Sequence, residues 1–301
     1  MPATAPPTPV DSATVLLLRE VAPTGLEVLL VARHAESRAF AGAHVFPGGL
    51  LEASDRAPEV RRAMAPSLSP DMAHAILGED LAPEAALAYF AATIRELFEE
   101  AGILLADQDG GPLGLADPAV RDRFAAHRRA LNAGTLGFAE LVARERLTLR
   151  GGDLRYFSRW ITPVHAPRRY DARFFVAPVP ADQVPLHDER ETTSAEWWAP
   201  ADALAGAAAG SLVLTPPTAR SLEELVELAT MARVLEDARR RRVTPILPKV
   251  VQIGDRMGVL YPGDVDYDAT EPGAALPADR SGTLNRVIMD DAGWRRFRGL
   301  R

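Results

Sequence analysis

Three glutamates lie within five residues in the stretch Arg95–Ile103, which reads RELFEEAGI. On a helix, positions i, i+3 and i+4 share a face, so Glu96, Glu99 and Glu100 would present three carboxylates together. A solvated helix face with an ion pair between Arg95 and Glu99 is the common explanation of such a pattern. The alternative is a site for a hard cation, because oxygen ligands suit Mg²⁺ or Mn²⁺. A carboxylate-bound Mg²⁺ most often serves phosphate chemistry.

A glycine pair lies upstream of this acidic segment. Residues 46–55 read FPGGLLEASD, which places Gly48 and Gly49 on a loop after a short strand. Because glycine has no side chain, the backbone there can approach a metal ion or a phosphate closely. The two stretches together favour the cation site over the solvated helix face.

At these two stretches the sequence resembles the Nudix hydrolase family. The family's box runs glycine, five residues, an acid, seven residues, and then Arg-Glu-apolar-any-Glu-Glu-any-Gly-apolar. Arg95–Ile103 fits the second half at every specified position, and Gly49 and Asp55 fit the first half, with Asp where Glu is usual. Between Asp55 and Arg95 lie 39 residues where the family has seven, which implies an insertion of 32. The interrupted box resembles that of a subgroup similar to the peroxisomal coenzyme A diphosphatases.

The resemblance implies a role for the central residues of the box. Glu99 and Glu100 would be the principal metal ligands, and Glu96 would bind metal or activate water. Arg95 would orient the glutamates, and the carbonyl of Gly48 would complete the coordination. The implied cofactor is Mg²⁺ or Mn²⁺.

Two further acids, Asp55 and Glu191, are candidates for the same site. Asp55 belongs to the box, but the insertion that follows it leaves its place in the site open. Family members often supply one more acid from a loop before a strand that carries Glu-Trp. Glu191, six residues before Trp197, is the candidate here. A polar loop residue without a catalytic role is an equally common explanation of Glu191.

The residues before the glycine pair bear on the substrate. Coenzyme A-cleaving family members carry two leucines, two arginines, a glycine and Phe-Pro-Gly-Gly at fixed gaps. The sequence has Leu29, Leu30, Arg33, Arg38, Gly42 and Phe46–Gly49 at those gaps, and departs from the signature at Val31 and His34. Arg33 and Arg38 could clamp phosphate oxygens beside Gly49. Alternatively, one of the arginines pairs with Glu36 or another surface acid.

Composition excludes several other kinds of site. The chain has no cysteine, which removes disulfide scaffolds, thiolate zinc sites and cysteine nucleophiles. Its six histidines show no paired ligand spacing, and its single lysine, Lys249, follows no P-loop. The net charge of −7 argues against a nucleic-acid surface. No apolar run approaches the roughly 20 residues of a membrane span. We therefore expect a cytoplasmic protein with a small-molecule partner, and leave a homodimer open.

The order of the apolar patterns predicts an α/β fold. Strand-like runs at residues 13–20 and 26–33, joined by a turn, indicate a hairpin. A helix is expected from about Pro83 to a left-handed cap at Gly102, followed by a strand at 103–107. The resemblance implies an α/β/α sandwich around a mixed β-sheet.

The order of these segments predicts how the chain is organised. We expect a disordered tail at 1–11, a Nudix domain at 12–205 with a box insertion at 56–82 and a helical insertion at 115–150, and a helical and β extension at 206–301 packed on the same domain. The box insertion has the composition of a surface excursion, and long loops cost little additional closure entropy. In the extension, a capping box of Ser221 with Glu224 predicts a helix running to about Arg241.

The predicted activity is hydrolysis of a nucleotide-linked diphosphate by metal-activated water. The resemblance favours coenzyme A or acyl-coenzyme A, cut to 3′,5′-ADP and (acyl)phosphopantetheine. ADP-ribose or another nucleoside-diphosphate derivative is the alternative substrate. A catalytically silent nucleotide-binding module is the alternative of another class. Retention of Glu96, Glu99 and Glu100 argues against it, because a silent module is expected to lose box carboxylates.

Overall fold

A mixed eight-stranded sheet forms the centre of the molecule. The computed structural model describes residues 6–22, 25–34, 42–186, 192–277, 282, 284–290 and 293–297. The strand order is β10 (Thr192–Trp198), β2 (Gly25–Arg33), β1 (Val10–Val21), β9 (Tyr170–Pro178), β8 (Arg155–Ile161) and β11 (Pro245–Ile246), with β3 (His44–Val45) on β2 and β4 (Gly48–Leu50) on β1. β1 and β2 form the expected antiparallel hairpin, whereas β1 and β9 run parallel.

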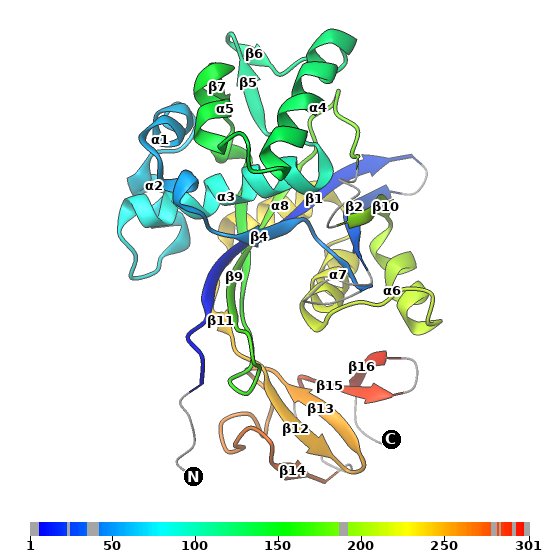
Figure 1. The fold of residues 1–301 in the computed structure, drawn as a ribbon. Helices are drawn as coiled ribbons and strands as arrows, with labels where there is room; N and C mark the ends of the chain where they lie inside the picture. The colour runs from blue at the N-terminus through cyan, green and yellow to red at the C-terminus, as the bar shows by residue number, and fades with distance from the viewer. Residues whose placement is uncertain are drawn as a thin grey trace.

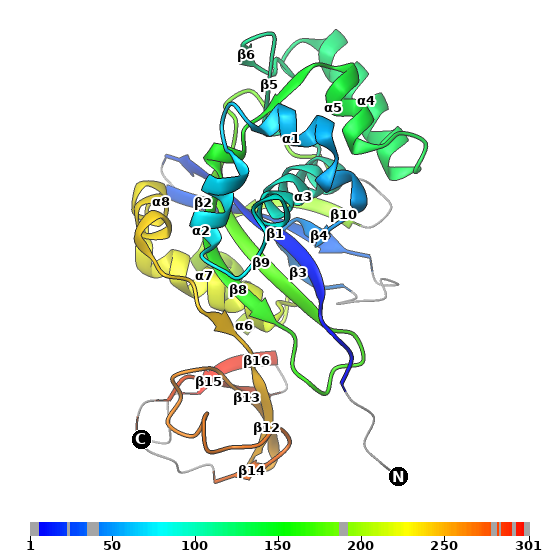
Figure 2. The same ribbon diagram turned by 90° about the vertical axis from the view of Figure 1, so that its left-hand side faces the viewer.

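Helices cover both faces of this sheet (Figures 1 and 2). One face carries α1 (Pro58–Met64), α2 (Pro70–Leu77), α3 (Pro83–Ala101), α4 (Pro118–Asn132) and α5 (Phe138–Arg144), and the other carries α6 (Pro200–Ala208), α7 (Pro216–Leu228) and α8 (Met231–Arg240). Side chains alternate along a strand. Val15 and Leu17 of β1 therefore enter the core under α3, while Leu16 and Leu18 enter the core under α7 and α8. The prediction of an α/β/α sandwich is confirmed.

Helix α3 has the predicted ends. Pro83 lies in its first turn, and Gly102 caps it in the left-handed conformation at φ 70°. The strand expected at 103–107 is wrong in its start, because β5 spans only Ala106–Gln108. The backbone of Leu104 instead pairs with the side chain of Gln183, which accepts from its N–H at 2.8 Å and donates to its carbonyl at 3.0 Å. β5 joins β6 (Gly111–Pro112) and β7 (Leu147–Leu149) in a small sheet.

The box insertion is part of the core, so the expectation of a surface excursion is wrong. After η1 (Ala53–Arg56), α1, α2 and the segment between them bury Val60, Met64, Leu68, Ala73 and Leu77 in the same core as α3 and one face of the sheet. Beyond α2, Glu79 lies 2.6 Å from Arg173 Nη2 and 2.8 Å from Arg159 Nη1, and accepts from the hydroxyl of Tyr156 at 2.7 Å. Both arginines stand on strands of the main sheet, so an ionic contact as well as apolar packing holds the insertion in place.

The helical part of the extension is two helices rather than one. Thr215, not Ser221, precedes the first turn of α7, and Ser221 is buried inside that helix. The chain turns at Ala229, whose φ of 64° ends α7, and Thr230 caps α8 by accepting from Arg233 N–H at 3.3 Å. The predicted capping box therefore fails, because Ser221 packs in the interior.

Besides the main sheet and the small sheet of β5, β6 and β7, a five-stranded sheet, called the second sheet below, lies toward the C-terminal end of the described chain. It runs β14 (Ala275–Leu276), β12 (Lys249–Ile253), β13 (Arg256–Leu260), β15 (Arg286–Asp290) and β16 (Gly293–Phe297), and lies beyond one end of the main sheet (Figure 1). Val251, Ile253 and Leu260 form its small core. Arg286 is fully buried and pairs with Asp264 and, at 2.9 Å, with Asp266. Within the described residues, no helix is both long and apolar enough to cross a membrane.

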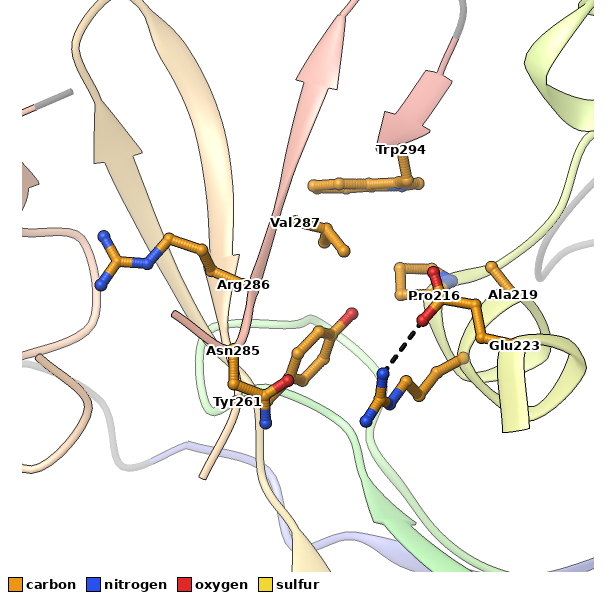
Figure 3. Close-up of a pocket in the computed structure, with 9 residues that line it drawn as sticks. Pro216, Ala219, Glu223, Tyr261, Asn285, Arg286, Val287 and Trp294 are labelled. Atoms are coloured by element: carbon orange, nitrogen blue, oxygen red, sulfur yellow. Dashed lines mark hydrogen bonds and ion pairs between the residues drawn. The ribbon is translucent and has the colours of Figure 1, made fainter. Parts of the chain in front are cut away.

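A pocket separates α7 from this second sheet (Figure 3). Its lining consists of Pro216, Ala219, Arg220, Glu223, Tyr261, Asn285, Arg286, Val287 and Trp294. Arg220 and Glu223, one turn apart on α7, form an ion pair at 3.0 Å on that side of the pocket. No residue of the acidic segment or the glycine loop lines this pocket, so the predicted chemistry lies elsewhere.

Candidate active site

Arg95 is the organising residue of the acidic helix. Its side chain is 1% exposed, and its guanidinium binds both carboxylate oxygens of Asp55, Nε to Oδ1 at 2.9 Å and Nη2 to Oδ2 at 3.0 Å. Nη2 also donates to the carbonyl of Leu50 at 2.7 Å. This two-pronged geometry is the strongest form of arginine–carboxylate pairing. Arg95 therefore ties the end of the glycine loop and the start of the box insertion to α3.

The same guanidinium gathers two of the three predicted carboxylate ligands. Arg95 Nη1 donates to Glu96 Oε1 at 2.8 Å and to Glu99 Oε2 at 3.0 Å. Both carboxylates thus lie within 3.0 Å of one nitrogen. Arg95 therefore contacts both carboxylates, and the orienting role that the resemblance implies for it stays a prediction.

The sequence predicts a loop at Gly48 and Gly49, but the two residues begin the short strand β4, which pairs with β1. The name glycine loop is kept here for residues 46–50, in which both glycines are closely packed. A side-chain carbon on Gly49 would lie 2.4 Å from Glu96 Oε1, and one on Gly48 would lie 2.4 Å from the carbonyl oxygen of Ala13. Neither glycine has a positive φ. The N–H of Gly48 donates to Glu100 Oε2 at 3.0 Å. The glycine loop therefore lies directly against the carboxylates of Glu96 and Glu100.

The predicted substrate-binding and loop residues fall into two groups. Arg33, at the end of β2, brings Nη1 to 3.9 Å from Glu100 Oε1, so it borders the acidic cluster. Arg38 and Glu191 lie outside the described residues, and their roles stay predictions. Of the two candidate phosphate-binding arginines, Arg33 therefore lies beside Glu100 of the box, although 67 residues separate them in the sequence.

Asp55 lies against Arg95 of the box in spite of the insertion between them. Its side chain is fully buried against Arg95. Its Oδ2 also accepts from the N–H of Glu52 at 2.7 Å, which closes a short turn before α1.

The sequence did not predict a role for Arg128 and Asn132, which both donate to the carbonyl of Glu99. Nothing in their spacing relative to the box could have revealed these contacts.

Burial governs the electrostatics of the cluster. Burial raises the pKa of Glu96 to about 7, with Glu99 adding to the rise and Arg95 opposing it. The pKa of Glu99 is raised by burial as well, again against the charge of Arg95. Burial alone would lower the pKa of Arg95, but contacts with Asp55, Glu96 and Glu99 outweigh it and raise the pKa above its ordinary value. The cluster thus carries more carboxylate than one arginine neutralises, which favours binding of a further cation.

The donor set fits a hard divalent cation in its chemistry. Glu96, Glu99 and Glu100 offer only oxygen, the ligand type that Mg²⁺ and Mn²⁺ prefer. In the described part of the chain, no group of three or more acidic or histidine side chains is already arranged around a point where an ion could sit. Two of the carboxylates face Arg95 and the third faces the N–H of Gly48. Binding would require some of these oxygens to turn toward the ion.

The raised pKa of Glu96 predicts how pH affects the metal-free protein. A carboxyl titrating near 4.5 in the unfolded chain and near 7 in the folded one binds more protons when folded between these values. Stability is therefore lost as pH rises through this window. In EDTA, urea unfolding should show the free energy of unfolding of the wild type falling relative to that of Glu96→Gln as the pH is raised from 5 to 8. Parallel pH profiles for the two proteins would contradict the assignment.

The sandwich, and the glycine loop lying on the acidic end of α3, define a Nudix hydrolase. The chain belongs to this family: the model of the NUDT19 Nudix domain matches residues 8–225. It is accordingly a Nudix diphosphatase by family, which confirms the class of enzyme predicted from the box.

The chain is also similar to named proteins of this family. The chain is 27% identical over 274 residues to the human acyl-coenzyme A diphosphatase NUDT19, covering 81% of this chain and 72% of that protein. The protein of the same name from Xenopus laevis is 26% identical, covering 80% of this chain and 71% of its own length. Among solved structures, a Nudix hydrolase from Alicyclobacillus acidocaldarius superposes with a TM-score of 0.57 at 26% identity, covering 76% of this chain and 96% of that one.

Proposed function

We propose that this protein hydrolyses the diphosphate of coenzyme A or acyl-coenzyme A, giving 3′,5′-ADP and (acyl)phosphopantetheine, with Mg²⁺ or Mn²⁺. The contact of the glycine loop with Glu96 and Glu100 supports the reaction class, since it brings glycine backbone beside two of the three box carboxylates. The relatives named acyl-coenzyme A diphosphatase support the substrate. We also propose residues 12–205 as the catalytic part and 206–301 as its extension.

Each box residue has a distinct part in this proposal. Glu96, Glu99 and Glu100 would hold the ion, which supplies charge neutralisation at the diphosphate and an acidified water. Arg95 restricts the side chains of Glu96 and Glu99 through its single Nη1. Asp55 fixes Arg95 in turn. Arg33 offers a guanidinium to the phosphates at the edge of the cluster.

A substrate panel with product identification tests the proposal. Coenzyme A, an acyl-coenzyme A and ADP-ribose are each incubated with Mg²⁺, with Mn²⁺ and with excess EDTA, and the products are identified by mass spectrometry. We expect 3′,5′-ADP from the first two, only with metal. Efficient cleavage of ADP-ribose without cleavage of coenzyme A would overturn the substrate. Binding of all three without any cleavage would favour a silent module.

Arg33→Ala is expected to lower kcat/KM for coenzyme A. A charged hydrogen bond contributes about 1.5 to 3 kcal/mol, which corresponds to about 10- to 100-fold in rate. If Arg33 binds phosphate, KM for coenzyme A rises while the Mg²⁺ concentration for half activation changes little. If Arg33 serves only Glu100, the Mg²⁺ dependence shifts and KM stays at the wild-type value. Steady-state kinetics with both ligands varied, with Arg33→Lys as the conservative control, separate the two results.

A further inference from the structure

Two side chains of α4 converge on one backbone atom of the acidic helix. Arg128 Nε donates to the carbonyl oxygen of Glu99 at 2.9 Å, and Asn132 Nδ2 donates to the same oxygen at 3.2 Å. Arg128 and Asn132 are four residues apart and so share a face of α4. Farther along, Phe124 of α4 packs edge-on against Phe98 of α3 at 6.3 Å between ring centroids. Thus α4, which lies outside the box, is fastened to the end of α3.

The carbonyl that they hold belongs to the last turn of α3. The last four carbonyls of a helix lack partners within it, and helix ends fray. Here the Phe98 carbonyl accepts from Gly102 N–H at 2.9 Å and the Ala101 carbonyl from Leu186 N–H at 2.8 Å. α3 has no basic residue of its own in this turn. Arg128 supplies the missing cation at the negative end of the helix dipole.

Arg128 also fits closely against the helix end. A side-chain carbon on Gly102 would lie 3.1 Å from Arg128 Nη1. The guanidinium therefore reaches from the carbonyl of Glu99 to the exit of the helix at Gly102. This span covers the turn from which the side chains of Glu99 and Glu100 project.

We propose that Arg128 and Asn132 are positioning residues of the active site. By holding the Glu99 carbonyl, they fix the turn of α3 that sets the origin and direction of the Glu99 and Glu100 carboxylates. The proposal rests on the proposed function, in which these carboxylates hold the metal ion. Outer partners of metal ligands contribute about 10- to 100-fold to metal affinity or activity, and these two act through the backbone of the ligand rather than through its carboxylate.

Mn²⁺ binding to the full-length protein tests this inference without relying on turnover. Calorimetric titration should show Arg128→Ala binding Mn²⁺ about 10-fold more weakly than wild type, or worse. In kinetics at fixed metal, kcat should fall more than KM for the nucleotide rises. Arg128→Lys, which keeps a cation and a donor, should recover part of the loss. Arg129→Ala, at the exposed neighbouring position of α4, should match the wild type.

A merely structural role gives a different pattern. Arg128→Ala would then lower the midpoint of thermal unfolding but leave the Mn²⁺ affinity of the folded protein at the wild-type value, which would overturn the inference. Should Arg128→Ala fail to fold, Asn132→Ala carries the same test with the same criterion. Glu99→Gln tests the metal assignment separately from the positioning role of Arg128 and Asn132. If it binds Mn²⁺ as tightly as wild type, the metal assignment falls and the inference falls with it.

Discussion

Glu99→Gln and Glu100→Gln are each expected to abolish most of the turnover while leaving the fold intact. Loss of a metal-bound carboxylate removes several kcal/mol of charge stabilisation, or about 100- to 1,000-fold in kcat. The glutamine at position 100 can still accept from the N–H of Gly48, the contact that Glu100 makes at 3.0 Å. Each change also removes a negative charge from a cluster with excess carboxylate. The metal-free thermal midpoint should therefore hold or rise slightly.

The comparison needs a change of the same chemistry on the same helix. Glu84 lies in the first turn of α3 and is exposed, so Glu84→Gln should retain wild-type kinetics. Steady-state rates at saturating Mg²⁺, with circular dichroism to check the fold, are the measurements. Wild-type turnover in both variants at positions 99 and 100 would refute the metal assignment.

Glu79→Ala is expected to destabilise the protein strongly. Its carboxylate is the 2.6 Å partner of Arg173, a side chain that is 2% exposed. It also neutralises Arg159 and accepts from the hydroxyl of Tyr156. Removing one partner of a buried ion pair costs about 3 kcal/mol, because the remaining charge stays buried. Asp171, 3.3 Å from Arg173, softens this loss but leaves the Tyr156 hydroxyl without its acceptor.

Urea unfolding measures the effect, and a matched pair isolates its cause. Glu79→Gln keeps an acceptor for Tyr156 and should fall between wild type and Glu79→Ala. Glu59, in the same insertion, forms an exposed pair with Arg62, so Glu59→Ala should unfold at the wild-type denaturant concentration. Equal midpoints for Glu79→Ala and Glu59→Ala would show that the insertion is held by apolar packing alone.

The elements that sequence predicted correctly are those whose signals are local. Pro83 and Gly102 mark the ends of α3, and the apolar repeat between them is the face that the structure buries. The box spacing likewise placed Arg95 and the three glutamates on one helix. Asp55 was harder, because motif counting alone could not say whether the inserted chain had carried it away. Its bond to Arg95 needs only that the two ends of the insertion meet.

The features that escaped prediction depend on partners chosen by the tertiary fold. Glu79 meets Tyr156 across 77 residues and Arg173 across 94. The insertion that carries Glu79 reads as a polar, alanine-rich surface segment, yet it packs in the core. Arg128 donates to a backbone carbonyl, and because every residue has one, the sequence does not indicate which carbonyl is bound. Gly48 and Gly49 pack closely against β1 and the carboxylate of Glu96, and their roles toward a metal ion or a phosphate stay predictions.

The bond between Asp55 and Arg95 has a consequence for how the chain folds. It joins points 40 residues apart, with two helices between them. The contact of Asp55 with Arg95 therefore forms only once the two ends of the insertion have met. If this contact forms late, we expect the proposed metal site to be incomplete in the folding transition state, so that an ion would not nucleate folding as zinc does in small domains. Stopped-flow chevrons should accordingly show Mg²⁺ slowing unfolding while the refolding rate stays unchanged.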